Sequence, residues 1–296
     1  MRRFSIAENF AFVANFLYKY IPKFLDFTDY RFTKSELIKL QKEVSHLQNR
    51  ILFKGEIEDW YFEIANIIRP VNFNDLQIVR VGSEFDGGYF VPLIPNLPKS
   101  WLSVGLGYNV EFENYLIKQG NTVNAFDHTI KSRPKKLSKL VKLHKIGWGP
   151  STGNTKSLYE LFSLTGYDQK WCLKFDIESS EWKVLHEISS AVNKPAIILC
   201  EIHDIYWEED RQSNAKKIKV LKQLLLEYHV VHINGNNFSP EIVTENVTIN
   251  SVIEMTLVKK DFLDMIPNSI ELESEISTTN YINNPKQRPS RFRIKY

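Results

Sequence analysis

The sequence predicts an α/β fold: a mostly parallel, doubly wound sheet with an antiparallel last strand, preceded by a helical N-terminal region. Short apolar runs with strand character recur from about residue 76 onward, and segments long enough for a helix separate most of them. Such alternation indicates a parallel sheet that is covered on both faces. The segment between residues 235 and 251 has no helix pattern, so we expect the strands on either side of it to pair antiparallel.

The composition is that of an ordinary globular protein. The chain has 296 residues, of which 43% are hydrophobic and 25% charged, enough for one large α/β domain plus an appendage. The net charge of +3 is too small to indicate a nucleic-acid partner by itself. Cys172 and Cys200 lie inside apolar runs, so we expect buried free thiols in a reducing, cytoplasmic protein.

Residues 1–70 are the predicted helical N-terminal region, and residues 71–296 the α/β domain. The first 25 residues begin basic and are rich in aromatic residues, which fits peripheral membrane contact, although packing on the domain or on a partner subunit is favoured. A short coiled-coil seam follows, formed by Leu37, Leu40, Val44, Leu47 and Ile51. It covers only about two heptads, so it fits a homo-oligomer contact and a helix packed on the main domain equally well. The region ends at Arg69–Pro70.

The elements of the α/β domain follow from local patterns. Strands are predicted within residues 76–82, 101–107, 122–127, 140–147, 171–177, 196–203, 228–235 and 251–260. Helices are predicted at residues 110–120, 157–166, 180–189 and 214–228. Gly120 closes the first helix as a C-cap.

The segment SVGLGYN forms a glycine turn at the end of a predicted strand. Gly105 and Gly107 allow a close approach of backbone to a ligand, and Asp127 ends the next strand, where an acid can accept hydrogen bonds from a ribose. Both a nicotinamide site and an S-adenosylmethionine site fit. The third glycine of the dinucleotide fingerprint falls at Val110, and a methyl donor without a pyrophosphate does not need it. S-adenosylmethionine is therefore favoured, and a ligand-free turn is the remaining alternative.

Polar side chains end three successive predicted strands at the same edge of the sheet. They are Asp176, Glu178 and Glu181, then Glu201, His203 and Asp204, then His232, Asn234, Asn236 and Asn237. Buried carboxylates and imidazoles are costly unless they are paired or bound to a ligand. The set therefore predicts a site, although Glu178 or Glu181 alone could be a solvated or capping residue.

The segments RVGSEFDGGYFVP, LSVGLGYNVEFE, NAFDHT, LKFDIESSEWKVL, EIH and HINGNN, in this order, resemble the FkbM-type S-adenosylmethionine-dependent methyltransferases and their methyltransferase-like relatives. The resemblance covers roughly residues 78–260. It implies a class I methyltransferase fold, with a Rossmann-like sheet, and O-methylation of a sugar, a glycan or another small hydroxyl acceptor. The sequence departs from the family pattern at Ser103, where an acid often precedes the first glycine, and at Ser179 and Ser180, where glycine is frequent.

These segments define the expected cofactor contacts. We expect Gly105, Gly107 and Asn109 to line the methionine and ribose side, and Asp127 to hold the ribose with His128 beside it. The further expected contacts are Asp86 and Gly87 from the DGGY block, Ile146, Gly147 and Trp148 beside the adenine, and Asp176.

Methyl transfer to a hydroxyl also requires removal of the acceptor's proton, because a sugar hydroxyl is a weak acid. His203 and His232 are the candidate bases, and His203 is favoured because Glu201 could orient its ring. In the alternative hypothesis, Asp176 and Glu201 bind Mg²⁺, which lowers the pKa of the acceptor hydroxyl.

Residues 131–145 contain seven Lys or Arg residues and no acid. We interpret this segment as a solvated loop and helix face, because it lacks the interleaved aromatic residues that stack on bases, and we expect no nucleic-acid partner. A nucleic-acid methyltransferase is the second enzymatic hypothesis. A non-catalytic membrane- or partner-binding module is the non-enzymatic one.

Overall fold

The computed structural model describes residues 53–296 except 74–75, 168–169, 264–274 and 280. The chain divides into two compact units, Met1–Gly55 and Glu56–Tyr296. The predictions for the aromatic N-terminus and the coiled-coil seam lie outside the described residues. The second unit, described below, begins at Glu56, whereas the sequence placed the domain boundary near residue 70.

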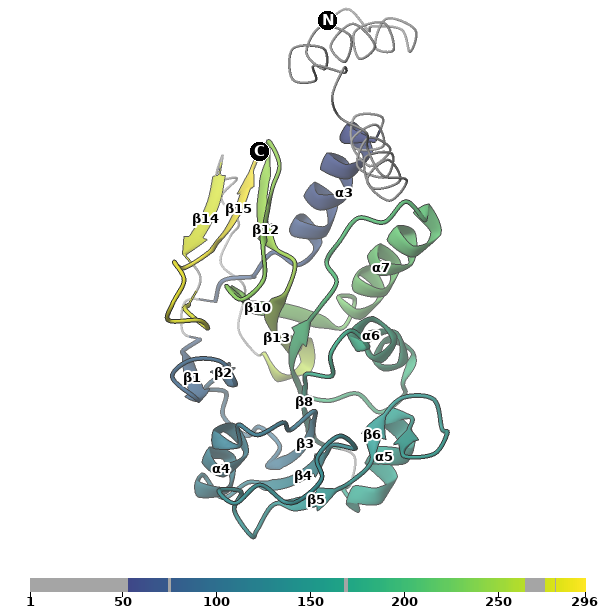
Figure 1. The fold of residues 1–296 in the computed structure, drawn as a ribbon, viewed down its shortest axis with the longest axis vertical. Coiled ribbons are helices and arrows are strands. Elements are labelled where there is room, and N and C mark those ends of the chain that lie inside the picture. The colour runs from purple at the N-terminus through teal and green to yellow at the C-terminus, as the bar shows by residue number, and fades with distance from the viewer. Residues whose placement is uncertain (1–52, 74–75, 168–169, 264–274, 280) are drawn as a thin grey trace, which may run out of the picture. The chain divides into compact units, whose positions relative to one another are not determined.

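A sheet of seven strands forms the centre of the second unit. In spatial order the strands are β10 (Tyr228–Gly235), β13 (Ile253–Lys259), β9 (Ile197–Ile202), β8 (Cys172–Phe175), β3 (Ser100–Val104), β4 (Thr122–Phe126) and β5 (Lys142–His144) (Figure 1). Strands β9, β8, β3, β4 and β5 are mutually parallel, and β13 pairs antiparallel with both β9 and β10. The predicted antiparallel pairing of the last two strands is confirmed.

Helices cover both faces of this sheet, as the apolar strands predict. The α-helices of the described residues are α3 (Lys54–Ile67), α4 (Glu111–Lys118), α5 (Leu158–Thr165), α6 (Glu181–Ser190) and α7 (Arg211–Leu224), and the short 3₁₀ helix η1 spans Lys260–Phe262. Residues of α3, α5, α6 and α7 share one hydrophobic cluster, and residues of α4 belong to another. Successive residues of β9 alternate between these two clusters, which places the clusters on opposite faces.

Local sequence signals explain where the helices begin and end. Ser157 and Glu160 form a reciprocal capping box at the start of α5, and Gly166 ends this helix with a left-handed backbone. Gly120, at φ +76°, follows α4 and allows the chain to turn back toward the sheet. The four helices predicted after residue 100 are all present.

The structure differs from the prediction at residues 76–82, which do not join the central sheet. Instead β1 (Ile78–Gly82) pairs antiparallel with β2 (Gly88–Pro92) in a separate hairpin. A further antiparallel sheet, which was not predicted, contains β11 (Glu241–Val243), β12 (Val247–Asn250), β15 (Arg291–Lys295) and β14 (Glu275–Thr279). The short strands β6 (Gly147–Trp148) and β7 (Thr155–Lys156) pair with each other.

The basic segment at residues 131–145 is a loop that ends in β5, and it contains no helix. All seven of its Lys and Arg side chains are exposed, so the predicted solvated loop is confirmed and the predicted helix face is wrong.

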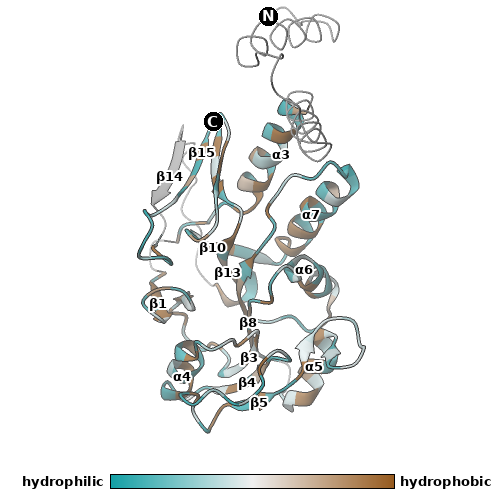
Figure 2. Cartoon of the chain, in the orientation of Figure 1, coloured by the Kyte–Doolittle hydropathy of each residue, from teal (hydrophilic) through white to brown (hydrophobic). Residues whose placement is uncertain are grey.

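Apolar residues are concentrated in the central strands, whereas α4 and α7 carry both hydrophobic and hydrophilic residues (Figure 2). Cys172 and Cys200 are buried free thiols, as predicted. Among the helices of the described residues, none combines the length and the apolar character that crossing a membrane requires.

Candidate functional site

Two cavities open at the carboxyl ends of the parallel strands. The first, of about 420 Å³, is lined by residues that follow β3, β4 and β8, and we call it the glycine cavity. The second, of about 280 Å³, is lined by residues that follow β8, β9 and β10, and we call it the acidic cavity. Asp86, Asp176 and Glu178 line both, so the two cavities adjoin. This is the edge of a doubly wound sheet where ligands bind.

The glycine turn after β3 has one position, Gly105, that only glycine fits. Gly105 has φ +77°, and a Cβ atom there would lie 1.6 Å from the carbonyl oxygen of Asp176. Gly107 has φ +58° with open space around its missing Cβ, so the turn exposes backbone to the cavity. Gly105 is therefore required by a close approach to the Asp176 backbone, whereas at Gly107 the backbone faces open space. The predicted approach to a ligand stays a prediction.

Asp127, at the end of β4, holds this turn in place. Its Oδ2 accepts hydrogen bonds from the backbone N–H groups of Leu106 (3.1 Å) and Gly107 (3.0 Å). Its Oδ1 accepts from the backbone N–H and the hydroxyl of Thr129. Burial opposes the charged form, but these hydrogen bonds outweigh it and lower the pKa of Asp127.

The turn between β1 and β2 closes the glycine cavity from another side. The side-chain amide of Asn109 donates to the carbonyl oxygen of Asp86 at 2.8 Å. A Cβ atom at Gly87 would lie 2.6 Å from the amide nitrogen of Asn109, so this contact requires glycine. The structure thus brings together Asp86, Gly87 and Asn109, as the sequence predicts.

The residues of β6, which follow β5, form another wall of the glycine cavity. Gly147 and Trp148 line the glycine cavity together with His128. A Cβ atom at Gly147 would lie 2.1 Å from Nδ1 of His128, so the glycine makes room for the imidazole. The Trp148 indole donates to Glu187 at 2.8 Å, which fixes its plane. Ile146 packs against the hydrophobic core instead of lining the cavity.

His203 lies in the acidic cavity among carboxylates. Its Nδ1 is 3.2 Å from Glu181 Oε1, and its Nε2 is 3.4 Å from Glu178 Oε2 and 4.0 Å from Glu201 Oε1. Burial alone would lower the pKa of His203, but the hydrogen bond and charge of Glu181, with Glu201 and Asp176, raise it to about 9. With no cation bound, this raised pKa favours the protonated ring at neutral pH, and a protonated ring is unsuited to the predicted role of base.

Glu181 has a different role from the one its sequence position indicates. Its side chain is fully buried and accepts hydrogen bonds from the Ile177 backbone N–H and from His203. It is therefore Glu181, and not Glu201 as expected, that orients the histidine ring. Glu201 accepts a hydrogen bond from Asn236 at 2.7 Å, and burial raises its pKa well above the usual value.

His232 does not reach either cavity. It lies within β10, and its ring packs on Phe90 with ring centroids 4.0 Å apart. Burial, together with the charge of Arg80, lowers its pKa to about 4. The structure therefore separates the two candidate bases and leaves His203 alone at the site.

Three of the residues at the site could hold a divalent cation. Asp176, Glu178 and His203 each offer one ligand atom, and these atoms lie within 4.8 Å of one another. Carboxylate oxygens with one imidazole nitrogen fit Mn²⁺ as well as Mg²⁺. Of the predicted pair, Asp176 belongs to this group, whereas Glu201 lines the same cavity beside it.

Strained backbone surrounds the acidic cavity. Glu178, Ser179 and Asp204 have positive φ angles of 53°, 70° and 58°, which side chains rarely adopt. The strained turn places Glu178 against the imidazole of His203.

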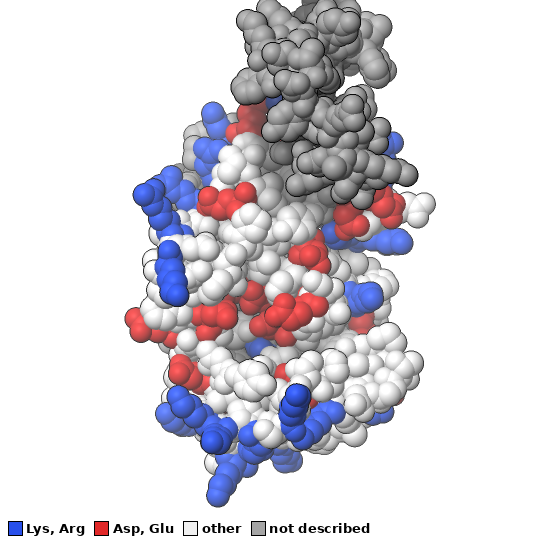
Figure 3. Space-filling model, viewed as in Figure 1, with Lys and Arg blue, Asp and Glu red and all other residues white. Residues whose placement is uncertain are grey.

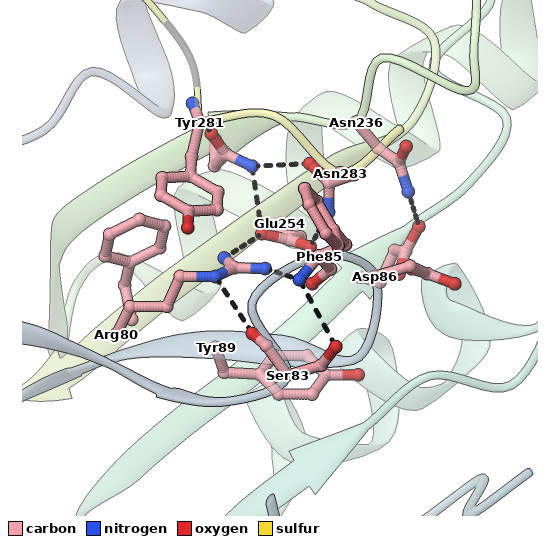
Figure 4. A network of polar contacts seen from close by, with 12 residues as sticks. Arg80, Ser83, Phe85, Asp86, Tyr89, Asn236, Glu254, Tyr281 and Asn283 are labelled. Carbon is pink, nitrogen blue, oxygen red and sulfur yellow. Dashed lines mark hydrogen bonds and ion pairs between the residues drawn. The ribbon is translucent and has the colours of Figure 1, made fainter. Parts of the chain in front are cut away.

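Sequence reasoning missed a buried polar network beside the acidic cavity (Figure 4). Glu254 of β13 lies 3.8 Å from Arg80 and accepts hydrogen bonds from Asn234 (3.0 Å) and Asn283. Burial raises the pKa of Glu254 to about 7 despite the charge of Arg80. The Arg80 guanidinium lies 4.1 Å from the Tyr281 ring centroid. An Arg and a Glu within apolar strand patterns are the signal that could have revealed the network.

Charge is distributed unevenly over the surface. Figure 3 shows Asp and Glu side chains grouped near the middle of one face, and Lys and Arg side chains around its lower end. The acidic cavity has four carboxylates in its lining, Asp86, Asp176, Glu178 and Glu201, with His203 as the basic group beside them.

Comparison of the chain with models of known protein families and with curated proteins gives no match. The fold defines an α/β protein with a mostly parallel central sheet and a pair of adjoining cavities at its carboxyl edge.

Proposed function

We propose that the protein is an S-adenosylmethionine-dependent O-methyltransferase that acts on a sugar, a glycan or another small hydroxyl acceptor. The observation that carries the proposal is the pair of adjoining cavities, one built on bare glycine backbone and the other on acids and an imidazole. The antiparallel β13, inserted between β9 and β10, also agrees with the class I methyltransferase fold that the resemblance implies.

The cofactor would occupy the glycine cavity. Its ribose would lie near Asp127 and its adenine near Trp148, so that the sulfonium points toward Asp176, where the two cavities meet. Tyr89 donates a hydrogen bond to Asp176 at 3.5 Å and restricts its orientation. A carboxylate at this junction would face the positive sulfonium and the incoming hydroxyl together.

The acceptor would enter the acidic cavity and lose its proton there. Burial raises the pKa of Asp176, which makes this carboxylate a stronger base than an ordinary one. Burial raises the pKa of Glu201 well above its usual value, which favours its protonated form, so Asp176 would accept the proton. The imidazolium of His203 would hold the neighbouring carboxylates and position them toward the hydroxyl. If a divalent cation is bound, Asp176, Glu178 and a His203 ring that has lost its proton would hold it in place of this arrangement. The cation would lower the pKa of the acceptor hydroxyl.

The acidic cavity argues against the nucleic-acid hypothesis. A polyanionic acceptor would have to bring its phosphates next to the carboxylates of Asp86, Asp176, Glu178 and Glu201, which repel them. The exposed basic segment at residues 131–145 is part of a different loop.

A methyl-transfer screen over sugars, glycans and phenols, with and without EDTA, tests the proposal. We expect activity in the wild-type protein and at least a hundredfold loss in Asp176→Asn. The matched control is Asp261→Asn, an exposed acid that pairs with Lys259 outside both cavities. Loss of activity in EDTA and its return with Mg²⁺ or Mn²⁺ would assign the main role to the cation. No binding of S-adenosylmethionine in calorimetry would refute the proposed function.

A further inference from the structure

A buried carboxylate of α4 reaches the glycine cavity with one oxygen left unpaired. Glu113 is only 1% exposed and lines this cavity. Its Oε1 accepts a hydrogen bond from the Ser103 hydroxyl at 2.6 Å, whereas its Oε2 has no hydrogen-bond partner. A buried carboxylate oxygen without a donor is costly, so a ligand that donates a hydrogen bond to Oε2 would be stabilised here.

A buried cation lines the same cavity. Lys174 is 3% exposed, and its ammonium donates to the carbonyl oxygen of Gly105 and lies 5.2 Å from the Tyr89 ring centroid. Lys174 of β8 is the register partner of Ser103 on β3. The sheet and α4 thus present one negative and one positive group to a single cavity, and an ammonium group has further donors to offer.

We propose that Glu113 and Lys174 recognise the zwitterionic amino-acid end of the cofactor. The free Oε2 of Glu113 would accept a hydrogen bond from the ligand's α-ammonium group, and the Lys174 ammonium would donate to its α-carboxylate. This proposal rests on the proposed function, because it assigns one end of the same cofactor. It deepens that function by naming residues that the sequence did not indicate.

The arrangement also accounts for Ser103, where the sequence departs from the pattern of the family that it resembles. In the family that the sequence resembles, an acid often stands at this strand position, and here the strand carries a serine instead. The Ser103 hydroxyl bonds the carboxylate that α4 delivers, so the acid at this point comes from the helix.

Three ligands separate the two halves of the proposed contact. S-adenosylhomocysteine carries both the amine and the carboxylate, decarboxylated S-adenosylmethionine carries only the amine, and 5′-methylthioadenosine carries neither. We expect Glu113→Gln to lower the affinity for S-adenosylhomocysteine at least tenfold in calorimetry. The same substitution should change the affinity for 5′-methylthioadenosine less than twofold. We expect Lys174→Met to lower the affinity for S-adenosylhomocysteine at least tenfold and to leave the affinity for decarboxylated S-adenosylmethionine unchanged.

Two further variants control for effects on folding and charge. Glu111→Gln removes an exposed acid from the first turn of the same helix and should change none of the affinities. Ser103→Ala keeps the Glu113 carboxylate but removes the bond that orients it, so it should weaken S-adenosylhomocysteine by a smaller factor than Glu113→Gln does.

The outcomes distinguish this proposal from the proposed function. Equal losses for S-adenosylhomocysteine and 5′-methylthioadenosine in Glu113→Gln, or no loss for either, would overturn the role of Glu113 while the cofactor assignment stands. If the wild-type protein binds none of the three ligands, the proposed function itself fails, and this inference fails with it.

Discussion

Replacement of Gly105 by alanine tests whether the glycine turn is built as described. A Cβ atom at this position would lie 1.6 Å from the Asp176 carbonyl oxygen, and backbone cannot move aside as a flexible side chain can. The left-handed φ of +77° adds roughly 1–2 kcal/mol for a residue with a side chain. Overpacking adds roughly 1–3 kcal/mol more. We therefore expect Gly105→Ala to lower the free energy of unfolding by about 2–5 kcal/mol.

Gly107→Ala is the matched control for this substitution. Its φ is also left-handed, at +58°, but no atom lies within 4 Å of the position that the new Cβ would occupy. Only the conformational cost of roughly 1–2 kcal/mol should remain. Urea unfolding of both variants, with unchanged slopes, measures the difference. Equal destabilisation by the two substitutions would refute the proposed contact between the turn and the Asp176 backbone.

Three other substitutions test separate features. Ser179→Gly should raise the free energy of unfolding by roughly 1 kcal/mol, because the φ of 70° favours glycine; unchanged thermal stability would mean that the turn is not strained. The folded-state pKa of His232, lowered to about 4, predicts that stability falls as pH drops from 6.5 to 4, since only the unfolded chain gains a proton there. His232→Phe should remove roughly 2 kcal/mol of this loss in urea titrations at pH 7 and 4.5, and an identical pH dependence in both proteins would contradict the assignment. Asp127→Ala should weaken S-adenosylmethionine by about 1–3 kcal/mol in calorimetry, because the glycine turn loses its acceptor; unchanged affinity would place the cofactor elsewhere.

The central sheet could be predicted because its strands are buried on both faces and therefore read as apolar runs. The strand at residues 76–82 was predicted, but its pairing with β2 in a separate hairpin was not, because an apolar run does not show which sheet it joins. The sheet around β12 was not predicted, because β12 pairs with β15, a short strand distant in the chain. The glycine cavity was largely predictable, since Gly105, Gly107 and Asp127 follow strand ends at a regular spacing. Ile146 was misplaced because a loop position says nothing about which way a side chain points.

The residues that were missed had a signal in the sequence. Glu113 lies three residues after Val110 and four before Ile117, which puts a charge on the apolar stripe of its helix. Lys174 interrupts the apolar run of β8. A charged residue at a position that the pattern assigns to the core needs a buried partner. Which residue is the partner depends on contacts between elements, and the sequence pattern does not show these contacts. The same holds for Glu181, whose partner His203 directly follows strand β9.

The insertion of β13 between β9 and β10 affects how the chain folds during its synthesis. During synthesis β10 leaves the ribosome before β13 does, yet its place in the sheet is beside β13. Until residues 253–259 emerge, the edge of β9 has no neighbour on that side, and β10 has no strand in the sheet to join. An unpaired apolar strand edge is prone to pair with other chains. Nascent chains halted before residue 253 should therefore depend on chaperones, and those that pass residue 259 should not.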